Sequence, residues 1–160
     1  MACCRRCSTR RNTRTEVRVF NQNNFIPSAV QVNYSLTQSF EANSELEFNE
    51  TTYNTGVSFS PRQDGFGIDI VSAGVYKITF TGTATATEDI TASIAISLNG
   101  VAIPQSEVSQ LIITQGPEIM YTTIVFKVIS PSANIDVINT GSTDFNVTNG
   151  KLDVVRVGNF

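Results

Sequence analysis

One stretch of strict alternation constrains the fold more than any other part of the sequence. Between residues 75 and 87, apolar or small side chains occupy the even positions, from Tyr76 to Ala86, and Lys or Thr occupies every odd position from Lys77 to Thr87. A period of two places the two sets on opposite faces of an extended chain. We therefore expect a long strand whose even-numbered side chains face a core.

The same period recurs along most of the chain, with turn residues between the repeats. Asn99-Gly100 is the strongest of these signals, because both residues tolerate the positive φ of a type I′ hairpin turn. About ten strands at this spacing predict an all-β antiparallel sandwich or barrel. Besides 75–87, the predicted strands are 30–36, 57–60, 66–71, 92–98, 101–103, 110–114, 119–129, 134–138 and 151–157, and Asn149-Gly150 is predicted to be a turn before the last.

The predicted strand 119–129 is apolar on both faces. Met120, Ile124, Phe126 and Val128 lie on one face, and Ile119, Tyr121, Val125 and Ile129 on the other. In an antiparallel sandwich the outer face is normally in contact with water. A second covering surface is therefore expected, and a neighbouring subunit is its simplest source.

The first eighteen residues differ from the rest in charge and chemistry. They hold all three cysteines and six of the eleven basic residues with a single acid, whereas residues 19–160 hold five basic and thirteen acidic residues. We expect residues 1–18 to be a Cys/Arg-rich connector arm and residues 19–160 to be one domain. Glu41, Glu45, Glu47 and Glu50 form an acidic cluster, which is read either as a charged surface loop or as a docking surface for such an arm.

The sequence offers little for catalysis. The chain has no histidine, and its cysteines lie in the arm. Glu88-Asp89 is read as a solvated turn rather than a pair of catalytic carboxylates. A metal site is weakly indicated, because Cys3, Cys4 and Cys7 supply three ligands where zinc needs four. We expect no enzyme activity, no cofactor and no membrane span, and the N-terminus lacks the apolar run of a secretory signal.

Two segments carry a resemblance to a known family. SAGVYKITF at 72–80 and ASIAISLNGVAIP at 92–104 resemble the TNF-like jelly rolls of the complement globular-head type, most of all the C-terminal domain of collagen-like proteins on bacterial spores. The segments 116–120 and 152–157 also read like family positions. The resemblance covers about residues 25–160 and implies a ten-stranded jelly roll that forms a homotrimer. The trimer interface it implies on strand 119–129 comprises Met120, Ile124, Phe126, Val128, Tyr121 and Val125. The collagen-like stalk usual in spore members is replaced here by the short arm.

The cysteine count suggests how such trimers would be joined. Cys3 and Cys4 are adjacent, so a bond between them is strained, and the body offers no partner. If all thiols are oxidised, bonds must join separate trimers or one thiol per trimer stays free. We therefore expect Cys3, Cys4 and Cys7 to form intermolecular disulfides; reduced, incidental thiols are the alternative.

The predicted function is a structural protein that assembles into a fibre or surface layer. The resemblance implies a spore-surface location, an appendage or exosporium component with other spore-surface proteins as further partners, reached after assembly in the mother cell. Two alternatives remain. One is a trimeric recognition head that binds a glycan or receptor. The other is a capsid-like shell protein whose arm binds nucleic acid through its arginines, which are Arg5, Arg6, Arg10, Arg11, Arg14 and Arg18.

Overall fold

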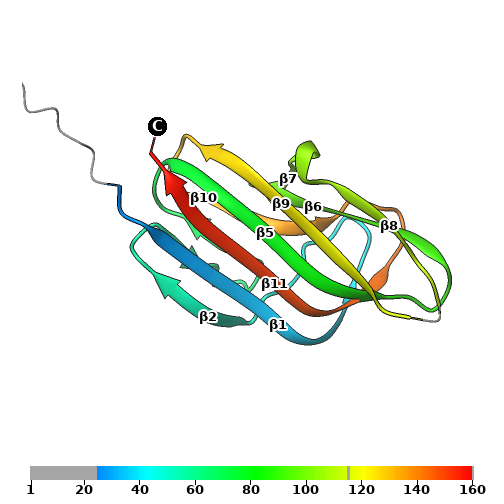
Figure 1. The fold of residues 1–160 in the computed structure, drawn as a ribbon. Helices are drawn as coiled ribbons and strands as arrows, with labels where there is room; N and C mark the ends of the chain where they lie inside the picture. The colour runs from blue at the N-terminus through cyan, green and yellow to red at the C-terminus, as the bar shows by residue number, and fades with distance from the viewer. Residues whose placement is uncertain (1–24, 115, 160) are drawn as a thin grey trace, which may run out of the picture.

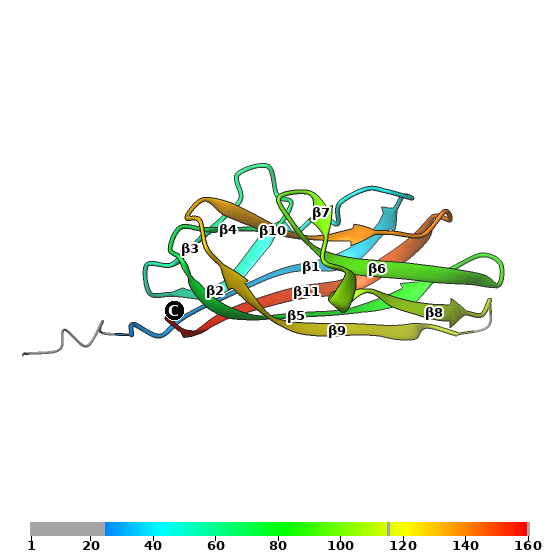
Figure 2. The same ribbon diagram turned by 90° about the horizontal axis from the view of Figure 1, so that it is seen from above.

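The computed structural model describes residues 25–114 and 116–159, which form two antiparallel sheets packed face to face (Figures 1 and 2). This is the all-β sandwich that the sequence predicts. The first sheet has the order β2-β1-β11-β5-β9; the second has the order β3-β4-β10-β6-β7, with β8 also paired to β6. The first sheet contains β1 (Ser28–Phe40), β2 (Glu50–Thr55), β5 (Gly74–Thr85), β9 (Glu118–Val128) and β11 (Phe145–Gly158). The second contains β3 (Phe59–Pro61), β4 (Ile68–Ile70), β6 (Ile90–Leu98), β7 (Val101–Ala102), β8 (Val108–Ile112) and β10 (Ala133–Asn139), and a 3-10 turn, η1 (Pro104–Ser106), follows β7.

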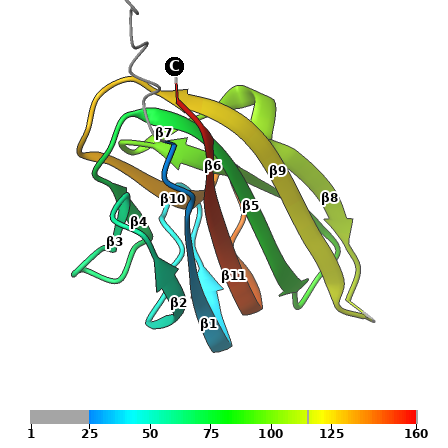
Figure 3. The same ribbon diagram turned by 60° about the vertical axis from the view of Figure 1, so that its left-hand side comes forward.

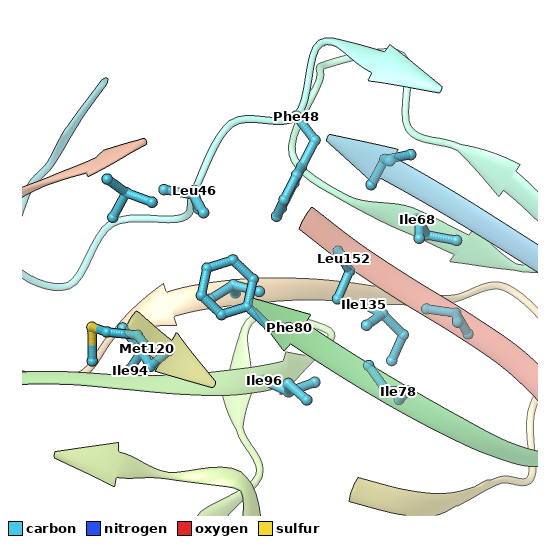
Figure 4. Packing of buried hydrophobic residues seen from close by; sticks show 14 of the residues in the cluster. Leu46, Phe48, Ile68, Ile78, Phe80, Ile94, Ile96, Met120, Ile135 and Leu152 are labelled. Atoms are coloured by element: carbon cyan, nitrogen blue, oxygen red, sulfur yellow. The ribbon is translucent and has the colours of Figure 1, made fainter. Parts of the chain in front are cut away.

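The core lies between the two sheets and is built by alternation. On β5, Tyr76, Ile78, Phe80 and Ala84 are buried, whereas Lys77 is exposed, so the predicted inner face is confirmed. Figure 4 shows Ile78 and Phe80 with Leu152, from the neighbouring β11, close to Ile94, Ile96 and Ile135 of the second sheet. Leu46 and Phe48, from the segment that connects β1 to β2, complete this core.

The hairpin prediction at Asn99-Gly100 is confirmed. The two residues connect β6 to β7 and have φ values of 53° and 75°. These are the left-handed angles that a type I′ turn needs at both central positions.

Strand β2 was not predicted. Its sequence, ETTYNT, is exposed along its whole length, and it pairs with β1 alone among the described strands. An edge strand without an apolar face shows no period-two signal, so sequence reasoning placed a strand at 57–60 instead. That segment contains a bend and only the start of β3.

The predicted turn at Asn149-Gly150 is wrong, because the two residues form a bulge within a strand and do not separate two strands. β11 runs through both residues, and its register with β5 shifts between Thr148 and Lys151. Asn149 does have the expected positive φ, 55°, but the angle serves a β-bulge within one long strand. The proposed boundary between residues 18 and 19 lies outside the described residues and stays a prediction; the first described strand begins at Ser28.

Candidate assembly face and the hollow beside it

The two faces of β9 have different surroundings. Met120 and Val128 are buried in the chain's own core, and Ile124 and Phe126 pack half-buried against it. On the opposite face Ile119, Tyr121 and Val125 are 66%, 51% and 63% exposed. We call these three residues the β9 outer face. No part of the chain that the structure describes covers them.

This division changes how the six predicted interface residues are read. Met120 and Val128 have their neighbours inside the subunit, which accounts for their apolar character; their predicted role in the trimer interface stays a prediction. Tyr121 and Val125 are on the surface, and so is Ile119, which shares their face of the strand but was not among the six predicted interface residues. Contact between subunits through the β9 outer face stays a prediction.

β9 is also an edge strand. Among the described strands it pairs with β5 alone, and Figure 3 shows it at one side of the first sheet, next to β8. The Gln110 side-chain amide donates a hydrogen bond of 3.1 Å to Glu118, which ties β8 to β9. Leu111 on β8 is a further exposed apolar side chain. Edge strands in isolated domains are usually protected by charge, by bulges or by covering segments. An apolar, regular edge strand instead suits a contact with another chain.

A hollow of about 400 Å³ lies beside this face on the first sheet. It forms where two bulges meet: β1 has the extra residue against β11 between Tyr34 and Thr37, and β11 has the extra residue against β5 between Thr148 and Lys151. Adjacent bulges increase the local twist and bend the sheet. The hollow is lined by Asn33, Tyr34, Ser35, Thr81, Gly82, Thr83, Ile119, Asn149, Gly150 and Lys151.

Most polar side chains of the hollow lack internal partners. Within the described part of the chain, no side-chain hydrogen bond or ion pair is made by Tyr34, Ser35, Thr81, Thr83, Asn149 or Lys151. Other polar side chains on the outer face of the first sheet, outside the hollow, do form hydrogen bonds across neighbouring strands. Thr79 bonds Thr123 at 2.9 Å, and the Gln31 amide donates to Asp153 at 2.5 Å.

A separate charged cluster holds two loops against the second sheet. Arg62 donates to Asp136 on β10 at 2.5 Å and to Asp64 at 2.5 Å, and its contact with Glu45 is 3.4 Å. Asp136 is fully buried and also accepts a bond of 3.2 Å from Ser97. Burial raises the pKa of Asp136 to about 6, the Glu45 charge adds to the rise, and Arg62 and Ser97 only partly offset it.

The other sequence-predicted sites have different outcomes. Cys3, Cys4 and Cys7, with Arg5, Arg6, Arg10, Arg11 and Arg14, lie outside the described residues. In the acidic cluster, Glu45 contacts Arg62 and Glu50 accepts a bond of 2.8 Å from Asn33, so these two have partners within the chain. Glu88 and Asp89 lie in the bend between β5 and β6, where Asp89 accepts hydrogen bonds from Thr114.

Two features are absent from the described residues. None of them forms a helix long and apolar enough to cross a membrane. Residues 25–114 and 116–159 also contain no group of three or more metal-ligating side chains placed to hold an ion.

The topology defines a jelly roll of the TNF-like and C1q globular-head type. Murine APRIL, in its structure at pH 5.0, is similar with a TM-score of 0.62 at 10% identity, over 82% of this chain and 100% of that one. The globular domain of the zebrafish complement 1qA protein gives 0.60 at 10% identity, over 83% and 99%. The PRD1 vertex protein P5 gives 0.51 at 15% identity, over 82% and 97%. At these identities the likeness shows the fold.

No protein-family model matches the sequence, and no curated protein is similar to it. The closer resemblance to spore-surface proteins stays a prediction.

Proposed function

We propose that the chain is a structural subunit that forms homotrimers through the β9 outer face and is joined to further trimers through its N-terminal arm. The observation that carries the proposal is the exposure of Ile119, Tyr121 and Val125 on a regular edge strand. The similar structures reported above, murine APRIL, the zebrafish complement 1qA globular domain and the PRD1 vertex protein P5, support a role in structure or recognition rather than catalysis.

The exposed face is large enough to matter for association. Full burial of a Val or Ile side chain stabilises by about 1.5–3 kcal/mol relative to exposure. At the observed exposures, each residue of the β9 outer face can therefore contribute about 1–2 kcal/mol to every contact between subunits. In a ring of three, the contact occurs three times, so a single substitution changes all three.

The trimer is tested by a matched pair of valine substitutions in the full chain, with reductant present to remove disulfides. Val125→Asp places a charge on the β9 outer face. Val57→Asp makes the same change at a residue that is 72% exposed and follows β2, at the opposite edge of the first sheet. Light scattering after size exclusion should show trimers for the wild type and for Val57→Asp, and monomers for Val125→Asp. A monomeric wild type, or equal behaviour of the two variants, would contradict the interface.

The arm is proposed to join trimers by disulfides. Without reductant, the protein should run on gels as a ladder of multimers and with reductant as the 17.4 kDa chain. Replacing Cys3, Cys4 and Cys7 with Ser should remove the ladder and shorten any fibres seen by electron microscopy, while the reduced trimer persists. Discrete trimers with or without reductant would refute the fibre and leave a trimeric recognition head.

A spore-surface location is part of the proposal and is supported by the sequence resemblance at 72–80 and 92–104. The capsid-like alternative makes a different prediction, because arginine arms that bind nucleic acid retain it at low salt and release it at high salt. Purified protein free of nucleic acid at low salt would exclude that alternative.

A further inference from the structure

We propose that the hollow on the first sheet binds an acidic saccharide, a sugar that carries a carboxylate or sulfate. The proposal rests on three observations: the hollow has the size of a ligand site, most of its polar side chains lack internal partners within the described residues, and it contains a cation, Lys151, with no ion-pair partner among them. Nothing in the proposed assembly role requires it.

The shape of the hollow follows from the backbone. Residues 149 and 150 of β11 lie opposite Gly82 on β5, and residues 35 and 36 of β1 lie within the neighbouring register shift. Gly150 and Gly82 line the hollow with their backbones, because a Cβ at either position would point into the core. The volume of about 400 Å³ lies within the roughly 300–1,000 Å³ of small-molecule sites.

The lining indicates a ligand with many hydroxyl groups. Thr81, Thr83 and Ser35 present hydroxyls that can both donate and accept, and Asn149 presents an amide with both functions. Such groups usually pair with each other on the outer face of this sheet, as Thr79 and Thr123 do. Around the hollow they stay unpaired within the described chain and point to a partner rich in donors and acceptors. Ile119 adds an apolar wall for the carbon skeleton of a sugar ring.

The charge of the hollow selects an acidic sugar. Lys151 is its single charged lining residue, and it has no ion-pair partner within the described residues. Glu50, the nearby acid, accepts its hydrogen bond from Asn33 instead. An ammonium that donates to a carboxylate or sulfate makes a charge-assisted bond, about twice as strong as a neutral one. A lone lysine is less suited to a nucleotide polyphosphate, which needs several donors.

The test is a titration of the full-length reduced chain followed by amide NMR shifts. D-glucuronate, D-galacturonate and a sulfated disaccharide are the acidic probes, and methyl glucoside is the neutral one. At least one acidic probe should give saturable shifts confined to 33–35, 81–83 and 149–151, and it should bind more tightly than the glucoside. Lys151→Gln should weaken that binding about tenfold. Thr81→Val should weaken it further without affecting folding.

Two controls make the result decisive. Lys77→Gln removes a lysine from the same face of β5, away from the hollow, and should leave the affinity unchanged. Because Ile119 borders both surfaces, the titration is repeated on Val125→Asp, in which no neighbouring subunit would cover the hollow. No saturable shift with any probe in either protein would overturn the proposal. So would an equal loss of affinity in Lys77→Gln, because it would show only nonspecific attraction to charge.

Discussion

From the buried carboxyl of Asp136 we predict that the stability of the protein falls as pH rises from 4 to 7. One guanidinium, that of Arg62, faces three carboxylates, from Glu45, Asp64 and Asp136, so it cannot neutralise them all. Asp136 is the most buried of these and has its pKa raised to about 6. A carboxyl whose pKa is higher in the folded than in the unfolded chain stabilises the fold while it is protonated, and this contribution is lost as pH rises.

The size of the effect follows from the pKa difference. The usual value is 3.8 and the folded value about 6. With about 1.4 kcal/mol for each pKa unit, the difference corresponds to about 3 kcal/mol. The contribution is fully present below pH 4 and is lost by about pH 6 to 7. Asp64 and Asp89 have pKa values below 3.8, so they stabilise the fold above that pH. They therefore do not cause a loss of stability between pH 4 and pH 7, where Asp136 ionises.

The measurement is urea unfolding of the reduced full chain, followed by circular dichroism at fixed protein concentration and ionic strength. From pH 4 to pH 7 the free energy of unfolding should fall by about 3 kcal/mol in the wild type. Asp136→Asn should remove most of this fall, whereas Asp69→Asn, the same change on β4 outside the cluster, should keep it. A wild-type stability that is constant or rises over this range, or a fall that survives in Asp136→Asn, would refute the reasoning.

Further predictions concern two glycines and a buried serine, all measured by urea unfolding at pH 7. Gly67 has φ of 108°, and a Cβ there would collide with the Ile135 carbonyl, so Gly67→Ala should cost about 3 kcal/mol. Gly100→Ala, at φ of 75° in open space, should cost about 1 kcal/mol; equal losses would show that the collision is unimportant. Ser106→Ala should cost about 2 kcal/mol, because its buried hydroxyl accepts from the Ile96 amide at 2.9 Å and donates to the Ile103 carbonyl at 2.7 Å. A loss below 0.5 kcal/mol would mean that these groups find other partners.

The sequence indicated some residues of the candidate surfaces but not which of them lie together. It shows that both faces of the strand 119–129 are apolar. Which face is internal depends on the pairing of β9 with β5, where Met120 lies opposite Gly82 and shares its buried side. The hollow was not predicted at all, because its lining comes from four strands. Its only sequence signal was Asn149-Gly150, which suggested a turn.

By itself, the sequence determined the all-β class, the inner face of β5 and the hairpin at Asn99-Gly100. Alternation and turn dihedrals act between residues close in the chain, so they can be read without knowing the partners. Only the tertiary structure decided that β1 lies beside β11, that Arg62 meets Asp136 seventy-four residues away, and that unpaired polar groups gather beside the β9 outer face. Those features depend on contacts between distant segments, which local periodicity does not specify.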